Sequence, residues 1–268
     1  MGSGIAQVAA AAGCSVILHD REERFIDRGL EIIQNNLNRS VERGRISQET
    51  RGKILAHING ESNLRDFDVA IAIEAATENL EIKRDLFRQL DNATPPEAIL
   101  ASNTSSISIT TLGAATKRPD KTIGMHFMNP VPAMQLVEII RGIATSQETF
   151  DATKTLAETF GKTPVEVRDF PGFVSNRVLM PMINEAIFAL FEGVGSAETI
   201  DTVMKLGMNH PMGPLQLADF IGLDTCLSIM EVLHEGFGES KYRPCPLLKQ
   251  YVAAGWYGKK SGRGFYSY

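Results

Sequence analysis

The first 170 residues alternate between amphipathic segments and short apolar runs. Between residues 21 and 47 apolar positions recur three or four residues apart, which predicts a long amphipathic helix, and a second helix is expected over residues 48–57. Short apolar runs, several of them rich in β-branched residues, predict strands instead. The predicted strands are CSVILHD (14–20), FDVAIAIEAA (67–76), AILASN (98–103), KTIGMHFMNP (121–130), MQLVEII (134–140) and TPVEVRD (163–169).

Further helices are expected between these strands, over residues 4–13, 80–90 and 147–160. Alternating strands and helices are typical of a doubly wound, mostly parallel sheet. Pro171 and Gly172 interrupt the pattern, and no strand is predicted after them. The helices expected there span residues 173–191, 196–206, 215–237 and 246–253. We therefore predict an α/β fold, with a Rossmann-type domain over residues 1–169 and an all-helical domain over residues 170–268.

The chain opens MGSGIAQVAAAAGCSVILHD, a helix, a strand and an acid, which is the order of the second part of a dinucleotide-binding unit. In such a unit a strand and a G-x-G-x-x-G turn precede the helix, and the last glycine lets the helix pack closely. Only that last glycine has a counterpart, Gly2. We expect the first, central strand to be absent, leaving two inner strand edges about 10 Å apart. We also expect weak activity or none toward NAD from a chain that begins at Met1, and full activity from the complete gene product.

Composition narrows the class of protein. With 43% hydrophobic and 22% charged residues, the chain is typical of a globular protein with a substantial core. The net charge of −5 argues against a nucleic-acid partner. Three widely spaced cysteines without a C-x-x-C pattern indicate neither a disulfide framework nor a metal site, and no apolar run is long enough to cross a membrane. We expect a cytoplasmic protein without a membrane partner.

Two residues of neighbouring predicted strands form a candidate acid–base pair. His126 ends one strand, and Glu138 lies in the next among leucine, valine and isoleucine residues. A carboxylate there has at least one buried side and needs a partner, for which His126 is the candidate. Carboxylate binding to one imidazole nitrogen fixes the tautomer and makes the other nitrogen more basic, as a general base requires. Taken singly, such a histidine is more often structural, and such a glutamate more often faces solvent.

The segment ASNTSSIS, residues 101–108, follows another buried strand. Ligands of open α/β folds collect beyond the carboxyl ends of the strands, so Ser105 and its neighbours are candidate ligand contacts. The alternative is a polar loop that caps the following helix.

Six segments together resemble the 3-hydroxyacyl-CoA dehydrogenase family, and in particular its short bacterial 3-hydroxybutyryl-CoA dehydrogenases. They are ENLEIKRDLF, ASNTSS, HFMNPVPAMQLVEII, FPGFVSNR, HPMGPLQLADFIGLD and GKKSGRGFY, and the resemblance runs from Met1 to Tyr268. It implies hydride transfer between NAD and a short-chain (S)-3-hydroxyacyl-CoA or 3-oxoacyl-CoA, in fatty-acid or butanoate metabolism. It also implies a homodimer formed through the helical domain.

The resemblance assigns roles to particular residues. His126 is implied to be the general base on the 3-hydroxyl, held by Glu138, while Ser105 and Asn176 bind the substrate near its reacting oxygen. The residues implied to line the cofactor site are Gly2, Asp20, Glu78, Lys83, Ser105, Asn129 and Lys260. For Lys83 and Lys260 the alternative is a solvated surface charge.

Two further points concern the cofactor and coenzyme A. Asp20 lies 18 positions after Gly2, near the spacing of about 20 at which an acid holds the adenosine ribose, and this favours NAD. Arg21 follows Asp20 directly and leaves NADP open as the cofactor.

Coenzyme A needs a cationic contact for its phosphates, and the resemblance implies Arg39 and Arg43, together with Ser105, as that contact. A solvated helix face is the alternative for Arg39.

Two other functions stay open on the sequence alone. One is another 3-hydroxyacid dehydrogenase of the same architecture, although those enzymes commonly use a lysine as the catalytic acid and base. The other is a non-catalytic relative that binds acyl-CoA or NAD without turnover.

Overall fold

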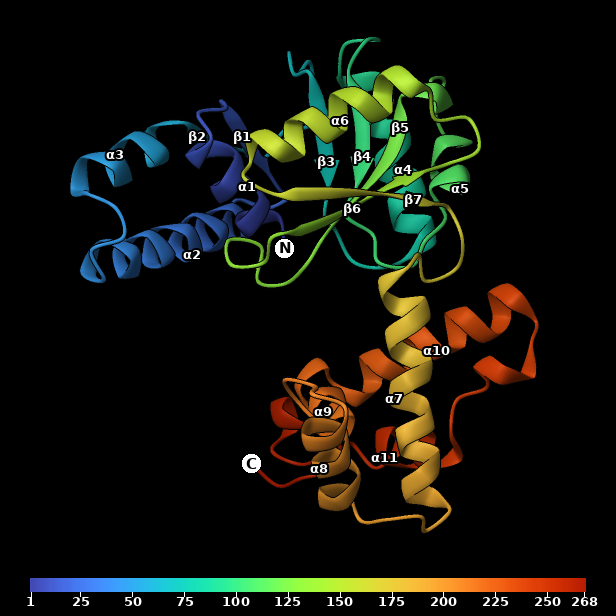
Figure 1. The fold of residues 1–268 in the computed structure, drawn as a ribbon. Coiled ribbons are helices and arrows are strands. Elements are labelled where there is room, and N and C mark those ends of the chain that lie inside the picture. The colour runs from blue at the N-terminus through green and yellow to red at the C-terminus, as the bar shows by residue number, and fades with distance from the viewer. The chain divides into compact units, whose positions relative to one another are not determined.

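The computed structural model describes all residues from Met1 to Tyr268, which divide into two compact units, Met1–Asp169 and Phe170–Tyr268. The first unit is built on strands and helices, and the second is helical (Figure 1).

The larger sheet of the first unit has five strands in the order β3, β4, β5, β6, β7. Every neighbouring pair is parallel except β5 and β6, which are antiparallel, so the prediction of a mostly parallel sheet is confirmed. The strands are β3 (Ile71–Glu74), β4 (Ile99–Ser102), β5 (Thr122–Phe127), β6 (Leu136–Arg141) and β7 (Thr163–Arg168). All six residues of β5 are buried, as expected for a central strand covered on both faces.

A separate two-stranded parallel sheet joins β1 (Val16–His19) to β2 (Ile58–Glu61) (Figure 1). Strands β1 and β3 do not pair, since β1 pairs with β2 and β3 pairs with β4. The prediction missed β2, because its sequence INGE has one buried apolar residue, Ile58, and its pairing depends on the backbone. A Cβ on Gly60 would lie 2.5 Å from Ile26, so glycine lets α2 (Glu23–Glu42) approach this strand.

The helices of the first unit cover these sheets. Helix α6 (Gln147–Thr159) packs on the larger sheet, while α2 and α3 (Gln48–Ala56) lie beside the smaller one (Figure 1). Side-chain caps begin four of them, since Ser47, Asn79, Ser108 and Ser146 each accept a hydrogen bond from a backbone amide of the first turn. The other helices are α1 (Gly2–Ala11), α4 (Leu80–Ala93) and the short α5 (Ile109–Gly113). The sequence analysis considered a helix after residues 101–108 and gave no bounds for it.

The regular elements of the second unit are all helices, as predicted. Its helices are α7 (Ser175–Phe191), α8 (Ala197–Gly207), α9 (Pro214–Ile221), α10 (Leu223–Phe237) and α11 (Pro246–Ala253). The prediction of a single helix over residues 215–237 is wrong. Gly222 has φ of 105°, which a helix cannot contain, so the chain turns there between α9 and α10.

Two buried aspartates hold the C-terminal segment of this unit. Asp219, 1% exposed, accepts hydrogen bonds from the amides of Phe265 and Tyr266. Asp201 accepts one from the Tyr266 hydroxyl at 2.8 Å and two from the amides that begin α9. Gly264 packs against Asp219, since a Cβ on this glycine would lie 1.9 Å from Asp219 Oδ1. Gly264 of the segment GKKSGRGFY therefore has a packing role.

Replacing Gly264 by alanine is expected to lower the free energy of unfolding by about 2–3 kcal/mol, because the new methyl group overlaps a buried carboxylate. Urea unfolding followed by the fluorescence of Trp256, the single tryptophan, measures the change. The control is Gly207→Ala at the end of α8, where a Cβ meets nothing within 4 Å. Equal stability of the two variants would contradict this packing role.

Candidate active site

The carboxyl ends of β3, β4 and β5 lie at one edge of the larger sheet, because these strands are parallel. Helix α1 begins at the same edge, since a Cβ on Gly2 would lie 3.8 Å from Ala75 and one on Gly4 would lie 3.0 Å from Val131. Gly29 of α2 lies close to both Ser3 and Leu18, so β1 ends near the start of α1. The exposed Asp20 follows β1 directly.

His126 and Glu138 face each other across β5 and β6, where the register pairs them directly. His126 Nδ1 lies 2.8 Å from Glu138 Oε2, with Glu138 1% and His126 9% exposed. An ionised carboxylate only accepts hydrogen bonds, so a neutral imidazole that pairs with it through Nδ1 is the tautomer with its proton on Nδ1. The predicted pairing is confirmed, and with it the burial of Glu138.

Asn103 ties the loop after β4 to the strand that carries His126. Its Oδ1 accepts a hydrogen bond of 2.9 Å from the amide of Phe127, the residue next to His126. The sequence analysis placed Asn103 at this edge of the sheet and gave it no such role.

Ser105 lies in the loop between β4 and α5, where Glu78 binds the backbone. Glu78 Oε1 accepts hydrogen bonds from the amides of Ser105 and Ser106, at 2.9 and 3.0 Å, and from the hydroxyls of Thr104, Ser105 and Ser106. Partial burial raises the pKa of Glu78, but these hydrogen bonds and the charge of Lys83 outweigh it, so the pKa lies below its ordinary value. Glu78 is therefore ionised at neutral pH.

Lys83 of α4 is 1% exposed, which excludes a solvated surface charge. Its Nζ lies 2.7 and 2.9 Å from the two carboxylate oxygens of Glu74 and 3.4 Å from Glu78 Oε2. Glu74 also accepts a hydrogen bond of 2.7 Å from the Ser102 hydroxyl. The sequence analysis missed Glu74, although an acid inside the apolar run VAIAIEAA signals a buried carboxylate that needs a partner.

The remaining candidate residues are divided between the two units. In the first unit, Asn129 is exposed in the loop after β5. In the helical unit, Asn176 is buried in the first turn of α7, and Lys260 pairs with Asp224 at 2.6 Å. Arg39 is exposed in the last turn of α2, and Arg43 is the residue that ends that helix.

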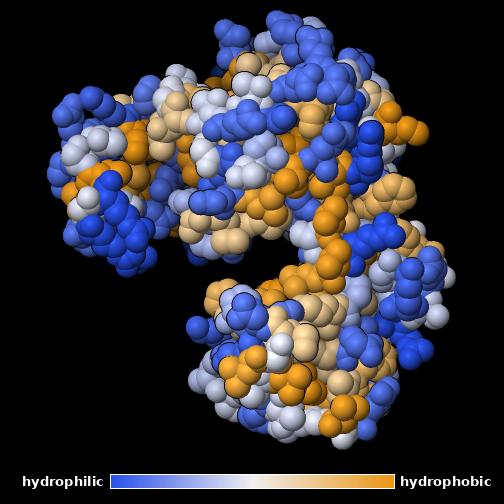
Figure 2. Space-filling view, viewed as in Figure 1, coloured by the Kyte–Doolittle hydropathy of each residue, from blue (hydrophilic) through white to orange (hydrophobic).

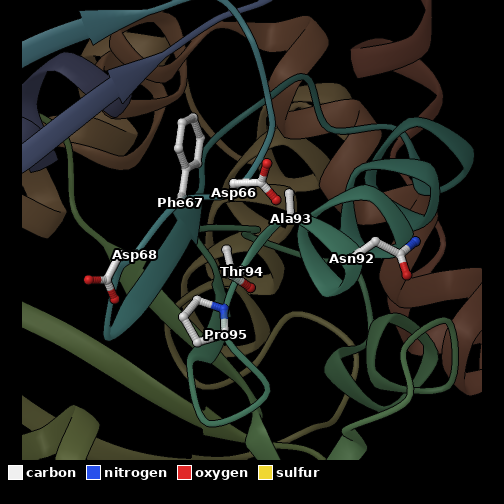
Figure 3. A pocket seen from close by; sticks show the side chains of 7 residues that line it. All are labelled: Asp66, Phe67, Asp68, Asn92, Ala93, Thr94 and Pro95. Carbon is white, nitrogen blue, oxygen red and sulfur yellow. The ribbon is translucent and has the colours of Figure 1, made fainter.

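A pocket of about 280 Å³ lies at the opposite ends of the strands (Figure 3). It is lined by the segment before β3, including Phe67, and by the last residues of α4 and those that follow it, including Asn92 and Thr94. None of the candidate residues lines it, so it is separate from the edge that carries His126.

No group of three or more histidine, cysteine, aspartate or glutamate side chains in the structure is arranged to hold a metal ion. None of the helices combines the length and apolar character of a membrane span.

Comparison with known proteins identifies the family. The model described as "3-hydroxyacyl-CoA dehydrogenase, NAD binding domain" matches residues 1–170, and that of the C-terminal domain of the same family matches residues 172–268. A probable 3-hydroxybutyryl-CoA dehydrogenase of Bacillus subtilis is 60% identical over 269 residues, covering 100% of this chain and 94% of the relative. A 3-hydroxybutyryl-CoA dehydrogenase of Bradyrhizobium diazoefficiens is 56% identical over 269 residues, covering 100% of this chain and 92% of the relative.

Solved structures agree. The crystal structure of (S)-3-hydroxybutyryl-CoA dehydrogenase from Ralstonia eutropha is similar to this fold with a TM-score of 0.98 and 48% identity, covering 100% of this chain and 95% of that one. The chain belongs to the 3-hydroxyacyl-CoA dehydrogenase family.

Proposed function

We propose that this protein interconverts (S)-3-hydroxybutyryl-CoA and acetoacetyl-CoA with NAD as hydride carrier. The observation that carries this proposal is the buried contact of 2.8 Å between His126 and Glu138. The substrates named for the relatives in Bacillus subtilis and Ralstonia eutropha support the choice of acyl-CoA.

In the oxidative direction His126 Nε2 accepts the proton of the 3-hydroxyl group. Glu138 holds Nδ1–H and stabilises the imidazolium that forms, because the ionised carboxylate lies 2.8 Å away and is excluded from water. NAD, when bound at the residues proposed below, would supply the hydride acceptor for C3 of the substrate. Ser105 and Asn176 are the groups we propose to bind the substrate oxygen.

Gly2, Asp20, Glu78, Lys83, Asn129 and Lys260 are the other residues we propose for the cofactor site. The exposed carboxylate of Asp20, near the start of α1, suits the ribose hydroxyls of NAD and repels the 2′-phosphate of NADP. Arg21 could oppose that effect, but its Nε lies 3.4 Å from Glu22 Oε1, so its charge is partly compensated. NAD is therefore the preferred cofactor.

The alternative of a lysine-dependent dehydrogenase receives no support from Lys83. Its Nζ is bonded to Glu74 on both oxygens, and the side chain is 1% exposed, so it is not available as an acid or base for substrate. The non-catalytic alternative predicts binding without turnover, which an assay separates.

Turnover is tested by mixing the protein with NADH and acetoacetyl-CoA and following the loss of NADH absorbance. We expect oxidation of NADH, with slower oxidation of NADPH and little reaction with free acetoacetate. Tight binding of both ligands without turnover would favour the non-catalytic relative.

Arg39 and Arg43 are proposed to bind the phosphates of coenzyme A. We expect Arg43→Gln to raise KM for acetoacetyl-CoA about fivefold at low ionic strength and less at high salt, with kcat unchanged. Acetoacetyl-pantetheine, which lacks the nucleotide, serves as the control substrate, and Arg88→Gln on the exposed face of α4 serves as the control variant. An equal rise in KM for both substrates would contradict the assignment.

A homodimer formed through the helical unit and a cytoplasmic location complete the proposal. Figure 2 shows hydrophobic residues, in orange, at the surface of the helical unit. The exposed large apolar side chains of α7 and α8 include Val178, Phe191 and Leu206. Apolar surface of this kind favours association with a second copy. Light scattering should give twice the mass of one chain, and the mass of a single chain would contradict the dimer.

A further inference from the structure

A buried charge cluster lies under the loop that carries Ser105. Glu74 ends β3 and is 6% exposed, and Lys83 on α4 is 1% exposed. Removing such charges from water is unfavourable unless each finds charged and hydrogen-bonding partners. If either side chain were lost, the other would be a buried charge without its partner. The positions of Glu74 and Lys83 therefore depend on each other.

The ammonium group of Lys83 makes its hydrogen bonds with other groups of the protein. Its Nζ contacts both oxygens of Glu74, the carbonyl of Ala76 at 3.2 Å, and Glu78 Oε2 at 3.4 Å. With these partners and almost no exposure, its ammonium group influences a ligand chiefly through the carboxylates that it joins.

The two carboxylates bind different parts of the same edge. Glu74 accepts hydrogen bonds from the amide of Ala76 and from the hydroxyl of Ser102, which link the ends of β3 and β4. Glu78 binds the amides and hydroxyls of residues 105 and 106. At the far end of this loop, Asp169 accepts a hydrogen bond of 2.7 Å from the Ser108 hydroxyl. The loop is thus anchored at its start, middle and end.

We propose that Glu74 is a positioning residue of the dehydrogenase reaction, which holds Lys83 away from Glu78 and thereby fixes the loop that presents Ser105. This inference rests on the proposed function, because it takes Ser105 to bind the substrate oxygen. Without the charge of Glu74, Glu78 is the remaining anionic partner of Lys83. Lys83 then moves toward Glu78 and competes with the Ser105 and Ser106 donors. A small displacement of a binding group costs rate more than affinity when it acts on the reacting atom.

A double-mutant cycle tests this dependence on Ser105. We expect Glu74→Gln to lower kcat about tenfold when Ser105 is present and less than about twofold in a Ser105→Ala background, with KM for acetoacetyl-CoA little changed. The matched control is Glu81→Gln on α4, the helix that carries Lys83. Glu81 is an exposed acid 3.1 Å from Arg84, and its replacement should leave kcat unchanged in both backgrounds.

Amide hydrogen exchange gives a readout that does not depend on turnover. The peptide covering residues 103–108 should exchange faster in Glu74→Gln and at the unaltered rate in Glu81→Gln. If Glu74→Gln is recovered only as aggregate, Glu74→Asp keeps the charge, withdraws the carboxylate by one methylene group, and should show the same dependence on Ser105.

The outcomes separate the two proposals. Turnover by the unmutated protein with equal losses of kcat in both backgrounds would overturn the positioning role of Glu74 alone. Unaltered exchange in the loop of a folded Glu74 variant would also overturn it. Absence of turnover by the unmutated protein would overturn the proposed function, and this inference with it.

Discussion

Replacing His126 by glutamine is expected to lower kcat for acetoacetyl-CoA reduction by about 1,000-fold, because no other group at this position can exchange a proton with the substrate oxygen. Glutamine can still hydrogen-bond to Glu138, which lies 2.8 Å from the imidazole, so the strands should keep their register. The rate is measured with NADH and acetoacetyl-CoA both saturating.

Binding should survive this substitution. KM for acetoacetyl-CoA and the dissociation constant of NADH are expected to change by less than about threefold, since the loss concerns the transition state. A kcat within tenfold of the unmutated protein would show that His126 does not transfer the proton.

Replacing Glu138 by glutamine is expected to lower kcat by about 100-fold. The glutamine amide can donate to Nδ1, which favours the imidazole tautomer with its proton on Nε2, where it blocks acceptance of the substrate proton. The neutral side chain also stabilises the imidazolium less. Steady-state kinetics in the oxidative direction measure the loss.

The control for this variant is Glu166→Gln on β7, the strand beside Glu138. Glu166 is partly exposed and lies 3.3 Å from Arg141, so losing its charge should leave kcat unchanged. Melting temperatures of both variants report on folding. A well-folded Glu138→Gln with full activity would mean that the carboxylate has no part in catalysis.

The acid–base pair could be predicted from sequence because a carboxylate in an apolar strand demands a partner. His126 and Glu138 also face each other directly because β5 and β6 are antiparallel. The alternation of strands and helices in the sequence does not specify that direction. The pairing was therefore predictable as chemistry, whereas its geometry required the structure.

The charge cluster under the Ser105 loop could not be predicted in the same way. Lys83 lies at a helix position that would be an ordinary solvated charge without Glu74 opposite it. The two residues are brought together by the packing of α4 against β3, which a reading of single segments does not reveal.

Backbone conformation explains the two errors in the predicted elements. Apolar residues continue at helical spacing through Gly222, so periodicity alone hides the turn that its φ of 105° imposes. Strand β2 has no apolar alternation to reveal it, because its pairing with β1 is made by the backbone. Both features depend on main-chain geometry, which hydrophobic patterning does not report.

The role of His126 as the proton carrier is tested most directly by comparing the pH dependence of kcat in the two directions. Oxidation of 3-hydroxybutyryl-CoA needs a neutral imidazole and should fall as the pH is lowered, whereas reduction of acetoacetyl-CoA needs an imidazolium and should fall as the pH is raised. In His126→Gln we expect both of these pH-dependent falls in kcat to disappear. Proton transfer by His126 would be contradicted if the same falls in kcat persisted in that variant. It would also be contradicted if, in the unmutated protein, kcat fell in the same direction of pH for both reactions.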